Sequence, residues 1–152
     1  MVGPETVTPE AVALVRRYCG NDNLIVGAQT GSDRLLRALH RNHTVADAYH
    51  AAEAIIAAGL RPVVDLIFGL PGEESDDVAA TLRLMEDLVD MGAVLHTHTF
   101  MPLPGTPLEG APPGKVDPVL HPLLDRLASQ GHQIGQWRKQ EEIARRSVAG
   151  KE

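Results

Sequence analysis

Three short runs of β-forming residues, each ending in glycine or proline, constrain the fold of this sequence most strongly. They cover residues 23–29 (NLIVGAQ), 61–69 (RPVVDLIFG) and 93–101 (AVLHTHTFM). Between these runs the pattern is helical, over residues 34–39, 45–58 and 76–91. Thr44 is a typical helix-capping residue, while Gly59 and Gly92 are typical helix stops. Strands that alternate with helices of this length predict βαβ units and a parallel sheet, so the expected fold class is α/β.

The two ends of the chain differ from this repeating pattern. Thr8 and Pro9 open a helix that is expected to cover residues 10–19 and to close at Gly20. Seven prolines between positions 102 and 122 predict an irregular connection, followed by helices near 118–131 and 134–148. We therefore expect residues 1–107 to form the strand-helix units and residues 108–152 to form a proline-rich connection and a C-terminal helical extension.

Composition excludes several classes of protein. With 152 residues and 43% hydrophobic content, the sequence can bury one core, as one domain or as part of a larger one. A net charge of -6 without a long basic run argues against a nucleic-acid surface. No stretch approaches the roughly 20 apolar residues of a membrane span, and the first ten residues lack an export signal, which favours a cytoplasmic protein. Cys19 is the single cysteine, and alone it cannot hold a cluster or a structural zinc.

The ends of the predicted strands are the expected location of a binding site. In parallel α/β folds, ligands bind beyond the carboxyl ends of the strands, and all three glycine- or proline-rich breaks fall there. The segment GLPGEES (69–75) would let backbone approach a ligand closely, because glycine has no side chain. On the second strand, Asp65 shares a face with Val63 and Ile67 and is predicted to point into a barrel or sheet interior. A buried carboxylate there needs a partner or a ligand.

Three segments together resemble the radical S-adenosylmethionine (SAM) enzymes. They are GAQTGSDRLLRALHRNHT (27–44), DLIFGLPGEESDD (65–77) and FMPLPGTPLE (100–109), in that order. The similarity is greatest to the methylthiotransferase-like, coproporphyrinogen-dehydrogenase-like and B12-domain-linked branches, and GQWRKQEEIAR (135–145) resembles the B12-linked proteins. The resemblance implies the three C-terminal βα units of a partial TIM-type (βα)6 barrel, plus C-terminal helices.

The resemblance also implies a set of SAM contacts. Gln29, at the end of the first strand, corresponds to a residue that hydrogen-bonds SAM. Arg41, expected on the following helix, corresponds to the partner of the SAM carboxylate, and Asp65 to the acid that binds the ribose. Residues expected to line the adenine are Ile67, Gly69, Met101 and Leu103. The chemistry is compatible, because arginine presents a planar fork to a carboxylate and aspartate accepts from hydroxyl groups.

The sequence departs from the family pattern at the iron-sulfur cluster. Such enzymes bind a [4Fe-4S] cluster with a C-x-x-x-C-x-x-C loop and the methionine amine with a Gly-Gly-Glu-type motif, and neither occurs in these residues. We therefore expect the SAM-binding C-terminal portion of an enzyme whose complete form reductively cleaves SAM to a 5′-deoxyadenosyl radical, with cobalamin as a further candidate cofactor. Its expected partner is the missing N-terminal barrel half or a second copy. The alternative is a non-catalytic, self-associating α/β module, and either form is expected to be inactive in isolation.

Several other polar residues have simpler interpretations. His96 and His98 share a strand face and could ligate a metal, but no third ligand of clear spacing follows, so polar lining is favoured over a metal site. No catalytic residue is predicted. His40, His43 and His50 are expected on the surface. Ser32 and Ser75 are interpreted as helix caps, because no G-x-S-x-G motif surrounds either.

Overall fold

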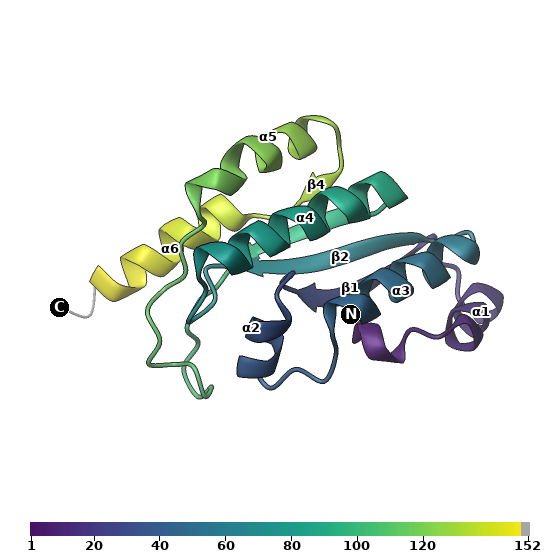
Figure 1. Ribbon diagram of the computed structural model, residues 1–152, viewed down its shortest axis with the longest axis horizontal. Coiled ribbons are helices and arrows are strands. Elements are labelled where there is room, and N and C mark those ends of the chain that lie inside the picture. Colours follow the sequence, from purple (N-terminus) through teal and green to yellow (C-terminus); the bar gives the residue numbers. More distant parts are fainter. Residues whose placement is uncertain (150–152) are drawn as a thin grey trace.

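Four parallel strands in the order β1-β2-β3-β4 form the centre of the fold (Figure 1). They are β1 (Asn23–Gln29), β2 (Arg61–Phe68), β3 (Val94–Thr99) and β4 (Gln133–Ile134). The computed structural model describes residues 1–149, with side chains up to residue 146. The first three strands and their parallel arrangement agree with the sequence prediction. The fourth was not predicted, because two residues are too few to show a strand pattern.

Helices connect and flank the strands. Their bounds are η1 (Pro4–Thr6), α1 (Pro9–Tyr18), α2 (Asp33–Ala38), α3 (Val45–Ala57), α4 (Ser75–Met91), η2 (Pro118–Leu120), α5 (His121–Ser129) and α6 (Trp137–Ala149). Ser32 caps α2 as predicted, and Thr44 forms a capping box with Asp47 at the start of α3. Ser75 is the first residue of α4, whose N-cap is Glu74 rather than Ser75 itself. α1 ends at Tyr18, so Cys19 lies just beyond the helix and not on it.

Alternating strand residues divide the sheet into a covered face and an open one. Leu66, Phe68 and Leu95 point to the covered face and are almost fully buried against leucines and Met85 of α4. α3 and α5 add further apolar residues to the same core. We call the opposite side the inner face, defined by Ile25, Gly27, Val63, Asp65, Ile67, Val94, His96 and His98. Its apolar members are only partly buried, as the 37% exposure of Ile25 shows.

Loops at the carboxyl edge of the sheet pack into a small apolar cluster of their own. Leu35 of α2, Leu70 after β2 and Phe100 after β3 form its buried centre. Backbone hydrogen bonds tie the same loops together, because Phe100 N–H donates to the Phe68 carbonyl (2.8 Å) and Gly114 N–H to the Phe100 carbonyl (2.9 Å). The predicted convergence of the three strand ends is thus present, and Leu108 and Ala111 of the irregular segment 102–117 pack against this cluster.

The N-terminal residues extend the sheet at β1. Val2 pairs in parallel with Val26, and two backbone hydrogen bonds of 2.9 Å join Val2 to Ile25 and Gly27. This single bridge satisfies part of the backbone edge that β1 would otherwise present to solvent. No helix within residues 1–149 is long and apolar enough to cross a bilayer.

Candidate functional site

A row of four residues crosses the sheet at the level of Asp65. Strand register places Gly27 of β1 opposite Asp65, Asp65 opposite His96, and His96 opposite Ile134 of β4. Cross-strand neighbours in register are close enough for their side chains to interact. Among these four residues, Asp65 and His96 are the two with hydrogen-bonding side chains, so they form the polar centre of the inner face.

Asp65 is buried and has a protein partner. The residue is 9% exposed, and its Oδ1 lies 2.8 Å from Nδ1 of His96. The expectation that this buried carboxylate needs a partner or a ligand is therefore confirmed, and the partner is His96. Within residues 1–149, no hydrogen bond to its second oxygen, Oδ2, is found, so that oxygen remains able to accept from a ligand.

His98 is held by α6 rather than by Asp65. Gln140 Oε1 accepts from the backbone N–H of Thr99 (2.9 Å), which turns the Gln140 amide nitrogen toward His98 Nδ1 at 3.2 Å. Burial lowers the pKa of His98, and the neighbouring His96 lowers it further, outweighing the opposite effects of Asp65 and Gln140. The lowered pKa favours the neutral ring, and the Gln140 amide orientation makes Nδ1 the acceptor and leaves the proton on Nε2.

Asp65 supplies the third potential metal-ligating group, which the sequence did not reveal. One potential ligand atom from each of Asp65, His96 and His98 lies within 4.8 Å of the others. Spacing along one strand could not show this, because the carboxylate comes from the neighbouring strand. A ligating imidazole usually donates its other N–H to a carboxylate or carbonyl. His96 matches that pattern, because its Nδ1 contacts the Asp65 carboxylate. His98 does not, because its Nδ1 accepts from Gln140 and the hydrogen is on Nε2.

Gln29 lies at the end of β1 in a strained conformation. Its φ is 69°, in the left-handed region that non-glycine residues seldom adopt, and the residue is 6% exposed. A Cβ on Gly27 would lie 2.6 Å from Gln29 Nε2, so the amide occupies the space that glycine leaves. Because Gly27 is the register neighbour of Asp65, the Gln29 amide and the Asp65 carboxylate share the inner face.

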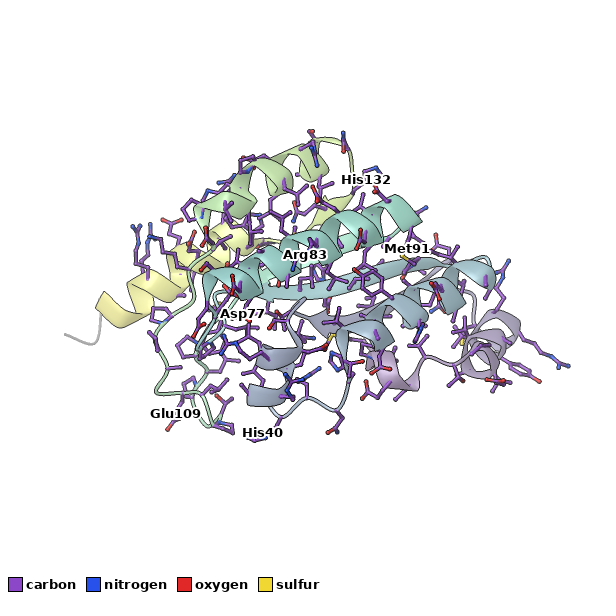
Figure 2. All side chains as sticks on the ribbon, in the orientation of Figure 1. His40, Asp77, Arg83, Met91, Glu109 and His132 are labelled. Atoms are coloured by element: carbon purple, nitrogen blue, oxygen red, sulfur yellow. The ribbon has the colours of Figure 1, made fainter. Side chains whose placement is uncertain are left out.

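Arg41 was predicted on a helix, and this is wrong. α2 ends at Ala38, His40 adopts a left-handed φ of 53°, and Arg41 follows in the turn with its N–H bonded to the Leu36 carbonyl (2.9 Å). The helix has only six residues because the left-handed residue ends it. Figure 2 shows His40 at the outer end of α2, away from the strands. Arg41 is exposed, and the structure does not bring its side chain to Asp65.

The four predicted adenine-lining residues lie near the carboxyl edge in different surroundings. Ile67 packs against the apolar loop cluster, and Met101 is half-buried, whereas Leu103 is 55% exposed. Gly69 has a φ of 69°, and a Cβ there would lie 2.4 Å from the backbone nitrogen of Lys115. The close approach that glycine permits at this position is therefore made by the chain's own backbone.

His43 was expected on the surface, and this is also wrong. It is 5% exposed, with Nε2 at 3.1 Å from the Ala28 carbonyl and Nδ1 at 3.7 Å from a carboxylate oxygen of Glu5. It thereby joins the start of α3 to the end of β1. The adjacent capping residue Thr44 was the available sequence signal, because a helix start packed against the sheet carries its preceding residue inward. His40 and His50 are exposed, as predicted.

A buried carboxylate links the first two strand-end loops. Asp77, at the N-terminal end of α4 (Figure 2), is 4% exposed and accepts hydrogen bonds from Ser32 Oγ and from the guanidinium of Arg34. Arg34 also donates to the Gly72 carbonyl (2.7 Å). Burial raises the pKa of Asp77, but the hydrogen bonds from Arg34, Ser32 and the Glu74 backbone outweigh this and lower it to about 2. No local sequence pattern indicates this network, because Ser32 and Arg34 lie 45 and 43 residues from Asp77 in the sequence.

Comparison with known proteins identifies the family. A sequence profile described as the radical SAM superfamily matches residues 2–85, which is more than half of the chain. This chain belongs to the radical SAM superfamily. An uncharacterized protein of Methanopyrus kandleri is 36% identical over 106 residues, covering 69% of this chain and 20% of that protein. The tRNA-2-methylthio-N(6)-dimethylallyladenosine synthase of Geobacter sulfurreducens is 36% identical over 112 residues, covering 70% and 24%.

Solved structures of radical SAM proteins share the fold. Coproporphyrinogen III oxidase (HemN) from Escherichia coli superposes with a TM-score of 0.64 at 20% identity, covering 86% of this chain and 31% of that one. The methyltransferase TsrM from Kitasatospora setae, with cobalamin and a [4Fe-4S] cluster bound, gives 0.59 at 22% identity, covering 70% and 21%. The chain thus spans 20–31% of the length of these four proteins. The α/β class, with part of a radical SAM barrel, is confirmed.

Proposed function

We propose that this chain supplies the ribose-binding side of a SAM site in a radical SAM enzyme whose complete form reductively cleaves SAM. The observation that carries the proposal is the Asp65 carboxylate on the inner face, which His96 engages at Oδ1 and which has Oδ2 left for a ligand. A carboxylate with one free oxygen is suited to accept from a ribose hydroxyl. The Gln29 amide on the same face adds a donor and an acceptor.

The residues of this chain fit one part of such a site and not another. Asp65 and Gln29 would hold the ribose, with Ile67, Gly69, Met101 and Leu103 near the adenine, and an exposed Arg41 would have to fold inward to reach the methionine carboxylate. When bound, SAM supplies the sulfonium carbon-sulfur bond that is cleaved. A [4Fe-4S] cluster does not fit these residues, because the single cysteine follows α1 at the amino edge of the sheet. We therefore assign the cluster-binding side of the site to a complementary barrel half.

The likeness to TsrM, whose structure contains cobalamin, is at 22% identity a likeness of fold. The two carboxyl-edge loops held by Asp77 instead support the SAM proposal, because they keep Gln29 and the segment after β2 in fixed positions relative to each other.

Titration of SAM into the complete barrel, assembled from this chain and a polypeptide carrying the remaining strands, tests the proposal. Asp65→Ala should weaken SAM binding by roughly ten- to hundredfold, the effect of losing a hydrogen bond to a charged group. Arg41→Ala should have a comparable effect if that side chain reaches the methionine carboxylate. Arg37→Ala and Glu53→Ala, which change exposed charges on α2 and α3, serve as matched controls. Equal affinities for Asp65→Ala and the controls would refute the proposed role and favour the non-catalytic module.

A further inference from the structure

The contact between Asp65 and His96 is set by the sheet and not by a flexible loop. The two residues are register partners on adjacent parallel strands, and the strands pair continuously from Val63 to Phe68 on β2. His96 Nδ1 lies 2.8 Å from Asp65 Oδ1, a distance typical of a charge-assisted hydrogen bond. The side chain of His96 is 34% exposed and that of Asp65 is 13% exposed, so the pair is partly shielded from water.

The partner of each histidine determines which ring nitrogen carries the proton. An ionised carboxylate can only accept, so His96 Nδ1 must donate to Asp65, and in the neutral ring Nε2 then has the lone pair. His98 has the reverse arrangement, because the Gln140 amide donates to its Nδ1. The two rings are neighbours, with centroids 4.3 Å apart and planes at 70°, but they serve different groups.

This difference separates a hydrogen-bonding role from a metal-binding one. A cation bound between Asp65 and both histidines would need a lone pair from each imidazole ring. The Nδ1 lone pair of His98 already accepts from Gln140, and its other nitrogen, Nε2, carries a hydrogen and cannot ligate. The Thr99 N–H fixes the Gln140 amide orientation, so reversing His98 would also disrupt a backbone contact at the end of β3. The arrangement therefore favours a carboxylate oriented by one histidine over a metal centre.

We propose that His96 is a positioning residue that holds the Asp65 carboxylate in its ligand-binding orientation. The carboxylate torsion of aspartate is broad, so a second contact is needed to hold one oxygen toward a ligand. The other register neighbour, Gly27, has no side chain to supply that contact. This inference rests on the proposed function, because the ligand group that Asp65 Oδ2 accepts is taken to be a ribose hydroxyl.

Two substitutions at His96 and one control separate positioning from simple packing. In His96→Asn the amide nitrogen takes the place of Nδ1 and can still donate to Asp65, whereas His96→Leu removes the donor while keeping an apolar stem. In the complete barrel, His96→Leu should weaken SAM binding roughly tenfold, and His96→Asn should stay within about threefold of the unsubstituted protein. His98→Leu removes the neighbouring ring without touching the Asp65 contact and should also stay within about threefold.

Nitrogen NMR of the imidazole rings provides a readout that does not need SAM. In this chain, His96 should show a protonated Nδ1 and His98 a protonated Nε2. The reverse for His96, or a His96→Leu protein that binds SAM as tightly as the unsubstituted one, would overturn the positioning role alone. Absence of SAM binding by the unsubstituted barrel would overturn the proposed function and this role with it. Stoichiometric Zn²⁺ binding that His98→Leu abolishes would overturn the role in favour of a metal site.

Discussion

Replacing Asp77 should destabilise the chain more than any other single carboxylate substitution on α4. Asp77 accepts from Ser32 Oγ, from the Arg34 guanidinium and from the Glu74 backbone N–H (2.8 Å). Its side chain is 5% exposed, whereas that of Arg34 is 48% exposed. Truncation to alanine would leave these donors without their shared acceptor and would separate the loop after β1 from the loop after β2.

Two independent considerations give the size of the effect. A pKa lowered from 3.8 to about 2 corresponds to at most about 2.5 kcal/mol of stability at neutral pH, and solvent screening at the exposed Arg34 reduces this value. Loss of hydrogen bonds to a charged group costs roughly 1.5 to 3 kcal/mol, and unpaired donors add to that cost. We therefore expect Asp77→Asn to lower the free energy of unfolding by about 2 kcal/mol and Asp77→Ala by about 3 kcal/mol.

Urea unfolding at several pH values is the assay. Because the native pKa of Asp77 is lowered, its contribution is present above pH 3.8 and is lost as the pH falls toward 2. The difference between the unsubstituted chain and Asp77→Asn should therefore shrink from pH 6 to pH 2. Asp76→Asn changes an exposed acid in the same helical turn and should cost little. Equal destabilisation by the Asp76 and Asp77 substitutions would refute the network and leave only an interaction with the helix dipole.

Substitutions outside the Asp77 network, and the open inner face of the sheet, have further measurable effects. Gly69→Ala should lower the unfolding free energy by about 3 kcal/mol in urea titrations, because its Cβ would meet the Lys115 backbone, whereas Gly92→Ala, with open space around it, should cost about 1 kcal/mol. Tyr49 donates to Asp87, and burial followed by that hydrogen bond raises the pKa of Tyr49 to about 12; absorbance titration of Asp87→Asn should give a lower value. The isolated chain should self-associate through its inner face at tens of micromolar, and light scattering that shows a monomer would contradict this.

The strand-helix pattern was readable because each element carries its own local signal. β1 and β2 are largely apolar runs, interrupted in β2 by Asp65, and such runs are typical of strands in a parallel sheet. Thr44 and Gly92 mark helix ends by capping and by left-handed backbone. β4 was not readable, because Gln133 and Ile134 become a strand only by pairing with β3. The end of α2 at Ala38 was missed for a similar reason, since the left-handed turn at His40 has no glycine to indicate it.

The candidate site was only partly predictable. The two-residue period of a strand predicted the direction of Asp65, and its burial predicted a need for a partner. Identifying His96 as that partner required the register between β2 and β3, which a single sequence does not contain. The burial of His43 and the contact between Gln140 and His98 likewise join residues that lie far apart in sequence.

Comparing SAM with analogues that lack the 2′- or 3′-hydroxyl would test the ribose contact of Asp65 most directly. Affinities would be measured calorimetrically in the complete barrel for the unsubstituted protein and for Asp65→Ala. If Asp65 accepts from a ribose hydroxyl, removing that hydroxyl should weaken binding by about tenfold in the unsubstituted protein and cause little further loss in Asp65→Ala. Equal losses in both proteins for both analogues would show that Asp65 does not contact the ribose and would contradict the proposed site.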